Sequence, residues 1–257
     1  MPPSGCIICL DPRQYVGWDG QQWTTLDELA SEGHHTVVRE EEPGLVGIGV
    51  EPTVAIGQRS LLVTSPGGNL LWDVAGFVDD AAMEYVSDHG GLVAVSASHP
   101  HFYGVMTEWA DAFDVPLMLP EADRRWITRS PRTLELYPDR VDVTSEIAIV
   151  RCGGHFPGSA VAHWTGSEDG RGVLLTGDSV AVAQDRDWVS FMWSYPNLIP
   201  VDAGALGAIE AALAPLSFDR IYGGWWGRAV ASNAQLAVRR SIERYLLAIS
   251  DTKSLEP

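Results

Sequence analysis

The stretch that decides the fold of this chain is LVAVSASHPHFYG, residues 92–104. A short apolar run, typical of a buried strand, ends in His99-Pro100-His101. Two histidines one residue apart at a strand end are typical of half a metal site, because neutral imidazole is a common ligand of transition metals. The other ligands must then come from elsewhere in the chain.

The composition restricts the classes of partner. The chain has 257 residues, 46% of them hydrophobic, and we expect one α/β domain spanning residues 1–257. Its formal net charge of −17 argues against nucleic acid and anionic membranes, since phosphate binding needs a basic surface. The apolar runs are too short for a membrane span, and no secretory signal pattern is visible. Three cysteines, an odd number, favour a reduced cytoplasmic protein. A small-molecule substrate is expected, and the oligomeric state stays open.

Residues 1–40 are polar and rich in turn formers, which predicts an N-terminal extension. It carries Cys6-x-x-Cys9, half of a zinc knuckle, with His34 and His35 as the nearest candidate partners. The alternative is a pair of inert or loosely paired thiols. Cys152, inside a predicted strand, is interpreted as a small buried apolar residue.

Beyond the extension, strand patterns cluster and then alternate with helical patterns. In the first half we predict strands at 44–50, 53–57, 60–65, 69–76, 91–98 and 116–120, with helices at 79–90, 103–113 and 121–127. In the second half we predict strands at 146–155, 160–165, 172–178 and 218–226, with helices at 201–216 and 233–249. This order predicts a mixed α/β fold, in which two mixed sheets pack face to face with helices outside.

Three further candidate ligands also lie at strand ends. His155 follows a strand after Gly153-Gly154, Asp178 follows a strand after Gly177, and Asp73 ends the strand that begins at 69. Strand ends at one edge of a sheet layer meet at a shared cleft, and glycines beside ligands let the backbone approach closely. Imidazole and carboxylate ligands together suit Zn, Fe or Mn rather than Ca or Mg.

The ordered set of motifs resembles the metallo-β-lactamase superfamily over roughly residues 45–247. The motifs are LLWD (70–73), SHPH (98–101), GGHFPGS (153–159) and LLTGD (174–178). The resemblance implies a four-layer αββα sandwich and a hydrolase. It matches the first two histidines of the family's HxHxDH loop to His99 and His101, the third histidine to His155, the bridging aspartate to Asp178, and the aspartate that supports the ligand loop to Asp73.

Two departures from the family pattern change what the resemblance implies. Tyr103-Gly104 stands where the family has the Asp-His of the second metal site, and Gly224 or Trp225 stands where it has a final histidine. The implied centre therefore holds one divalent ion, zinc before iron or manganese, with three histidines and Asp178 as fourth ligand or base. A second, structural zinc is expected only if Cys6 and Cys9 form a site.

Residues around the metal centre also have expected roles. Asp73 is expected to accept an imidazole N–H and so fix the tautomer of a ligand. Tyr103 has two interpretations, a catalytic hydroxyl that bonds substrate or water, or a ring that fills the second metal's space. Arg228 meets either an anionic group or a structural carboxylate. Loops that line the cleft in the family here carry Trp188, Phe191, Trp193, Tyr195, Trp225 and Trp226, which predicts a partly aromatic substrate.

Three functions are compatible with these residues. The first is a hydrolase with a mononuclear centre that cleaves an ester, thioester, lactone or amide. The second is an iron oxygenase using His99, His155 and Asp178 as a facial triad, as persulfide dioxygenases of the superfamily do, which requires His101 to stay off the metal. The third is a non-catalytic protein that kept the fold and a structural ion.

Overall fold

The structure is a computed structural model that describes residues 5–250. The first of its two large sheets has seven strands in chain order. Neighbours from β1 to β4 are antiparallel, and neighbours from β4 to β7 are parallel. The strands are β1 (His35–Glu42), β2 (Leu45–Glu51), β3 (Ser60–Val63), β4 (Leu70–Trp72), β5 (Ala94–Ser96), β6 (Leu117–Pro120) and β7 (Leu134–Tyr137).

The second sheet has six strands in the order β17-β16-β11-β10-β9-β8. Only the pair β11–β16 is parallel. The strands are β8 (Arg140–Asp142), β9 (Ile147–Arg151), β10 (Ala160–Trp164), β11 (Val173–Leu175), β16 (Arg220–Tyr222) and β17 (Ala229–Val230). Two small hairpins lie between β11 and β16 in sequence: β12 (Ala181–Val182) with β13 (Val189–Ser190), and β14 (Met192–Ser194) with β15 (Ile199–Pro200).

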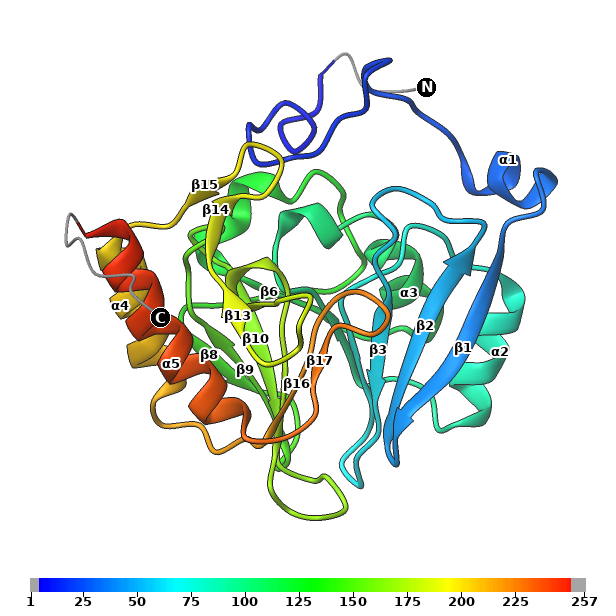
Figure 1. Ribbon diagram of the computed structural model, residues 1–257. Coiled ribbons are helices and arrows are strands. Elements are labelled where there is room, and N and C mark those ends of the chain that lie inside the picture. Colours follow the sequence, from blue (N-terminus) through cyan, green and yellow to red (C-terminus); the bar gives the residue numbers. More distant parts are fainter. Residues whose placement is uncertain (1–4, 251–257) are drawn as a thin grey trace.

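Helices cover the outer faces of both sheets. Figure 1 shows α2 and α3 outside the first sheet and α4 and α5 outside the second, with the N-terminal segment and α1 above them. The α-helices are α1 (Leu26–Ser31), α2 (Asp80–Asp88), α3 (Met106–Phe113), α4 (Ala203–Leu213) and α5 (Ala234–Ile249). Short 3-10 helices are η1 (Pro100–Phe102), η2 (Glu121–Trp126) and η3 (Asp178–Val180).

Three apolar clusters account for this arrangement. One lies between the sheets and includes Leu61 and Trp72 from the first sheet and Ile149 and Ala162 from the second. The others join each sheet to its helices. Burial of apolar surface on both faces of each sheet is the main source of stability for such layers. The predicted αββα sandwich is thereby confirmed.

The local predictions differ from the structure in several places. Residues 35–40, expected in the extension, belong to the edge strand β1, which pairs with β2. Residues 53–57 form a turn instead of a strand, because Ala55 and Gly57 have positive φ values of 54° and 74°. Seven short strands were not predicted, namely β7, β8, β12, β13, β14, β15 and β17. Among the helices of residues 5–250, none combines the length and apolar character needed to cross a membrane.

Candidate metal centre

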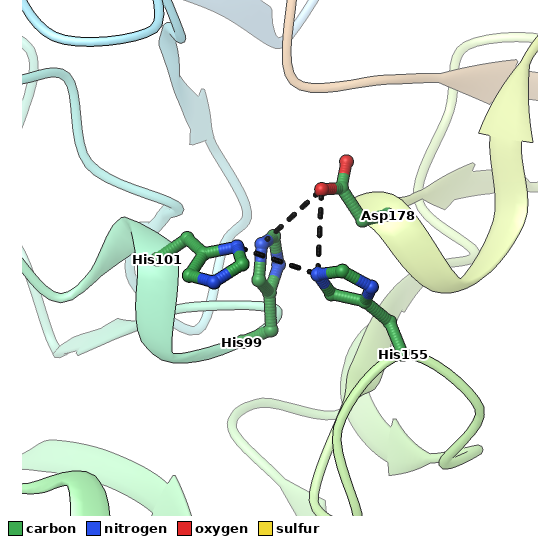
Figure 2. A group of neighbouring side chains, drawn as sticks. All are labelled: His99, His101, His155 and Asp178. Atoms are coloured by element: carbon green, nitrogen blue, oxygen red, sulfur yellow. Dashed lines mark hydrogen bonds and ion pairs between the residues drawn. The ribbon is translucent and has the colours of Figure 1, made fainter. Parts of the chain in front are cut away.

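Four side chains meet where strands of both sheets end. His99 and His101 flank the start of η1 after β5, His155 follows β9, and Asp178 begins η3 after β11. One ligand atom from each lies within 4.8 Å of all the others. Figure 2 shows the three rings and the carboxylate turned toward one another, although their positions span 80 residues of sequence. The structure thus brings together all four predicted metal ligands.

The spacing of these atoms fits a metal ion. His101 Nδ1 lies 3.3 Å from His155 Nε2. Asp178 Oδ2 lies 3.5 Å from His99 Nε2 and 3.6 Å from His155 Nε2. Two ligands of a tetrahedral zinc ion, each about 2.1 Å from the metal, are about 3.4 Å apart. In addition, His99 Nε2 is buried without a hydrogen-bond partner among the described residues, which is unfavourable unless the atom binds something.

A second layer of contacts holds the imidazoles in place. The Ser98 hydroxyl lies 2.9 Å from His99 Nδ1, and the Met192 carbonyl oxygen lies 3.1 Å from His155 Nδ1. Asp73 was expected to bond an imidazole directly, but its carboxylate accepts the backbone N–H of Ser98 at 2.6 Å. It therefore supports the ligand loop one residue away from His99, and the contact to the imidazole comes from Ser98.

One glycine is required for the ligands to meet. A Cβ atom at Gly177 would lie 2.0 Å from the Ser98 hydroxyl oxygen and 3.0 Å from His99 Nδ1. Any other residue would push apart the loops that carry His99 and Asp178. The glycine before the predicted ligand is thus explained by close approach.

Burial sets the protonation states at the centre. Desolvation, followed by the neighbouring His155, lowers the pKa of His101 to about 3. Desolvation lowers the pKa of His155 to about 4, and it holds that of His99 well below its usual range. The imidazoles are therefore neutral at pH 7, the form that binds metals. Burial raises the pKa of Asp178 to about 7, and a bound cation would favour its ionised form.

The cluster opens into a cavity of about 870 Å³. His101 and Asp178 form part of its wall, so a molecule in the cavity can reach the centre. Four of the seven residues predicted for the substrate pocket line it, namely Tyr195, Trp225, Trp226 and Arg228. The Tyr195 hydroxyl donates to the Asp178 carbonyl oxygen at 3.0 Å, which fixes this ring beside the centre.

The other three predicted pocket residues do not line the cavity. Phe191 is fully buried and packs against Tyr245 with ring centroids 5.6 Å apart. Trp193 packs on the apolar cluster beneath α4 and α5. Trp188 lies under the guanidinium groups of Arg240 and Arg244, at 4.4 and 3.6 Å from its ring centroid. These aromatics are directed into the packing between the small hairpins and the helices.

The loop between β16 and β17 is held against the first sheet. Trp226 lies on β2, where a Cβ atom at Gly47 or Gly49 would come within 2.6 Å of the indole. Because glycine has no side chain, two glycines on this face of β2 leave room for the indole ring of Trp226. The backbone N–H of Arg59 donates to the Gly224 carbonyl oxygen at 2.8 Å. This loop is therefore a fixed wall of the cavity.

Tyr103 takes a different place from the catalytic one predicted for it. The side chain is 4% exposed, its hydroxyl has no partner among the described residues, and it does not line the cavity. Burial and then the neighbouring Asp123 and Tyr137 raise its pKa well above the usual range, which places the hydroxyl on the interior side. The position favours the structural interpretation of Tyr103.

The space beside Gly224, where the family has its final histidine, contains aromatic rings. The ring of Phe102 would lie 3.0 Å from a Cβ atom at Gly224. Phe102 also packs edge-to-face on Trp225, with centroids 5.6 Å apart. Apolar packing thus fills the space beside Gly224.

The cysteines of the extension do not gather ligands. The Cys9 N–H donates to Cys6 Sγ at 3.4 Å, and burial together with Cys6 raises the pKa of the Cys9 thiol to about 11. Across residues 5–250 no third metal-binding side chain joins them. His34 instead has its Nδ1 3.0 Å from the Leu29 carbonyl oxygen. The predicted structural zinc lacks ligands here, and the structure describes two free thiols.

Sequence reasoning missed the contribution of the N-terminal segment. Arg13, Gln14 and Tyr15 line the cavity beside His101, and Thr53 and Ile56 do so from the loop after β2. No motif marks these residues, because they reach the centre through contacts distant in sequence. The only available signal was an arginine in a segment otherwise rich in turn formers.

Comparison with known proteins places this geometry in a family. No family model matches the sequence. The uncharacterized protein YmaE of Bacillus subtilis (strain 168) is 41% identical over 251 residues, which cover 97% of this chain and 91% of YmaE. The chain belongs to the same family as YmaE.

Solved structures similar to this YmaE-family chain include metallo-β-lactamases. FIM-1 from Pseudomonas aeruginosa, in its mono-zinc form, aligns with a TM-score of 0.58 at 15% identity, over 82% of this chain and 96% of FIM-1. DIM-1 aligns with a TM-score of 0.58 at 12% identity, over 81% and 96%. A B3 enzyme with an active-site glutamic acid aligns with a TM-score of 0.57 at 15% identity, over 93% and 96%. The chain has the metallo-β-lactamase fold, as its motifs predicted.

Proposed function

We propose that this protein is a metal-dependent hydrolase with one metal ion per chain. The observation that carries the proposal is the convergence of three neutral imidazoles and one carboxylate beside a cavity of about 870 Å³, whose wall includes His101 and Asp178. A divalent ion bound there would supply a nucleophile from water near neutral pH and polarise a carbonyl group. An ester, thioester, lactone or amide of a small molecule is the proposed substrate.

Residues of the chain bind the ion, orient its ligands and accept a proton. His99, His101 and His155 hold the ion, and the contacts from Ser98 and Met192 orient two of their rings. Asp178 lies in the cavity wall, where its carboxylate binds the ion or takes a proton from water. With a cation bound, this carboxylate would be ionised and could accept a proton.

The geometry favours this proposal over an iron oxygenase. An oxygenase triad would use two histidines and one carboxylate, with His101 away from the metal. His101 Nδ1 instead lies 3.3 Å from His155 Nε2 and faces the same point as the other ligands. A purely structural ion is disfavoured because the cluster borders a cavity that can hold a substrate.

The cavity wall supports an anionic and partly aromatic substrate. Arg228 lines the cavity, and its guanidinium makes no ion pair with a carboxylate in the described part of the chain. Tyr195, Trp225 and Trp226 supply aromatic surface on the same wall. We therefore propose that Arg228 binds a carboxylate group of the substrate, since a guanidinium can pair with both oxygens of such a group.

The metal and the compartment are proposed on chemical grounds. Zinc is proposed first because imidazole and carboxylate are ligands that it commonly binds, and iron or manganese are alternatives with the same donor set. All three cysteines are free thiols, which suits the reducing cytoplasm.

The test is metal stoichiometry combined with a substrate panel. Untagged protein would be stripped with a chelator and titrated with Zn²⁺, and we expect saturation at one equivalent. The loaded protein would then be assayed on carboxylate-bearing esters, thioesters, lactones and amides, with His155→Ala as the inactive control. Two tightly bound equivalents would contradict the mononuclear centre, and no turnover on the panel with zinc, iron or manganese would contradict the hydrolase.

A further inference from the structure

The N-terminal segment sends one side chain into the interior beside the centre. Residues 15–25 are exposed and form no helix or strand, and Figure 1 shows this part of the chain passing above the sandwich. Arg13 is nevertheless only 8% exposed. A guanidinium buried to this extent must be compensated by specific partners.

Those partners belong to the turn that carries a metal ligand. Arg13 Nη1 donates to the His155 carbonyl oxygen at 2.9 Å, and the guanidinium carbon lies 3.7 Å from the centroid of the Phe156 ring. The other edge of the guanidinium pairs with both carboxylate oxygens of Asp11 at 2.6 Å. Arg13 thus makes a hydrogen bond and a stacking contact with two consecutive residues of the ligand turn.

The segment is also tied to the strand that orients the ring of the same histidine. The Pro12 carbonyl oxygen accepts from the Ser194 hydroxyl at 3.1 Å and from Asn197 Nδ2 at 2.6 Å. Ser194 ends β14, whose first residue, Met192, contacts His155 Nδ1. His155 is therefore held on the backbone side by Arg13 and on the ring side by β14.

The turn needs such support because of its sequence. Gly153 and Gly154 precede His155 with φ values of 70° and 85°, in the region open mainly to glycine. A Gly-Gly turn loses more conformational entropy on ordering than other sequences do, so the position of His155 depends on the contacts that hold the turn. The Ser179 hydroxyl donates to the Gly153 carbonyl oxygen at 2.6 Å, and Arg13 holds the carbonyl oxygen of His155 itself. An external clamp lowers the entropy lost when metal binds.

We propose that Arg13 is a positioning residue of the metal centre, and that residues 11–15 belong to the site. Arg13 fixes the turn that presents His155 Nε2, and the next two residues, Gln14 and Tyr15, form cavity wall beside His101. This inference rests on the proposed metal centre. It predicts that the N-terminal segment controls metal affinity without supplying a ligand.

The experiment compares Arg13→Met with Arg125→Met as its matched control. Arg125 also stacks on an aromatic ring, with its guanidinium carbon 3.9 Å from the Trp126 centroid, but its side chain is exposed and contacts no ligand turn. Zinc dissociation constants would be measured by chelator competition, and the absorption spectrum of the cobalt-substituted protein would report the ligand geometry. We expect Arg13→Met to weaken zinc binding by roughly 10- to 100-fold, as loss of outer contacts to a ligand does, and to change the cobalt spectrum. Arg125→Met should stay within twofold of wild type.

Two further measurements test the positioning role of Arg13. Arg13→Lys retains the charge but cannot pair with Asp11 and the His155 carbonyl in the same geometry, so we expect an intermediate affinity. It also serves as the test if Arg13→Met does not fold. Zinc affinity and a cobalt spectrum unchanged from wild type in the Arg13 variants would overturn the positioning role alone. A wild-type protein that binds neither metal would instead overturn the proposed centre, and the inference with it.

Discussion

Replacing Asp73 with asparagine should change how the stability of the fold depends on pH. Asp73 is fully buried, one carboxylate oxygen accepts the Ser98 N–H, and the other has no partner among the described residues. Burial raises the pKa of this carboxyl to about 8. Its φ of 57° is one that asparagine adopts more readily than most residues. An amide therefore has nearly the shape and hydrogen bonding of the protonated acid.

The direction of the effect follows from proton binding. In chelated protein the folded state keeps the Asp73 proton up to about pH 8, whereas the unfolded chain releases it near pH ~4. Between these values the folded state binds one more proton, so this group lowers the free energy of unfolding as pH rises. The slope is at most about 1.4 kcal/mol per pH unit. From pH 5 to pH 7, wild type should lose up to ~3 kcal/mol relative to Asp73→Asn.

The assay is urea unfolding followed by tryptophan fluorescence at pH 5, 6 and 7 with a chelator present. The quantity compared is the difference in free energy of unfolding between variant and wild type, because the buried histidines titrate in both proteins and largely cancel. Asp88→Asn, at an exposed position on α2, is the matched control for the change of carboxylate to amide. A constant difference for Asp73→Asn would mean that Asp73 is ionised in the folded state, and would refute the reasoning.

Three other substitutions test the centre and its walls. His155→Ala should weaken zinc binding more than ~100-fold, because a metal ligand is lost. Its circular dichroism spectrum should stay unchanged, because the apolar core is intact. A variant with wild-type zinc affinity would remove His155 from the ligand set. Tyr103→Phe should leave zinc affinity and kcat within twofold in a titration and a rate assay, because the hydroxyl does not reach the cavity; a tenfold loss of kcat would restore its catalytic role. Gly49→Ala should cost ~1–3 kcal/mol in urea unfolding, because its Cβ would meet Trp226 at 2.6 Å, whereas Gly207→Ala on α4, with open space around it, should be neutral or stabilising. Equal stabilities of the two glycine variants would argue against the close packing of Trp226.

The ligands could be predicted from sequence because each belongs to a short motif at a strand end. A strand end and its next residues keep a fixed relation to the sheet edge, and the resemblance to the metallo-β-lactamase superfamily implied which strand ends meet. The Arg13 contact with His155 spans 142 positions and follows no periodicity. A contact of that kind depends on how a segment without helix or strand lies on the finished fold, which no local pattern specifies.

The aromatic residues show a different limit of sequence reasoning. Phe191, Trp193 and Tyr195 alternate along the chain and so share a predicted face, but alternation does not say which face meets the core. The structure buries Phe191 in the core, whereas half-buried Trp193 packs against the same cluster with the Arg13 guanidinium carbon 5.3 Å from its ring centroid. Tyr195 lies one residue beyond the end of β14, where the alternation stops, and its ring lines the cavity. Likewise, no local pattern in the sequence indicates that Trp226 packs on Gly47 and Gly49.

Aromatic rings fill the region around Gly224, where the resemblance to the metallo-β-lactamase superfamily would place a ligand of a second ion. Where a second ion is absent, the polar ligands that would have bound it must be removed, because buried polar groups without partners are unfavourable. Phe102 and Trp225 meet at Gly224, and Trp225 Nε1 donates to the Ile56 carbonyl oxygen at 2.9 Å, so the indole N–H is satisfied. The same packing closes one side of the cavity with apolar surface. A site that has exchanged ligands for such packing can regain a second ion only by losing these contacts, and this is the physical reason to expect one metal.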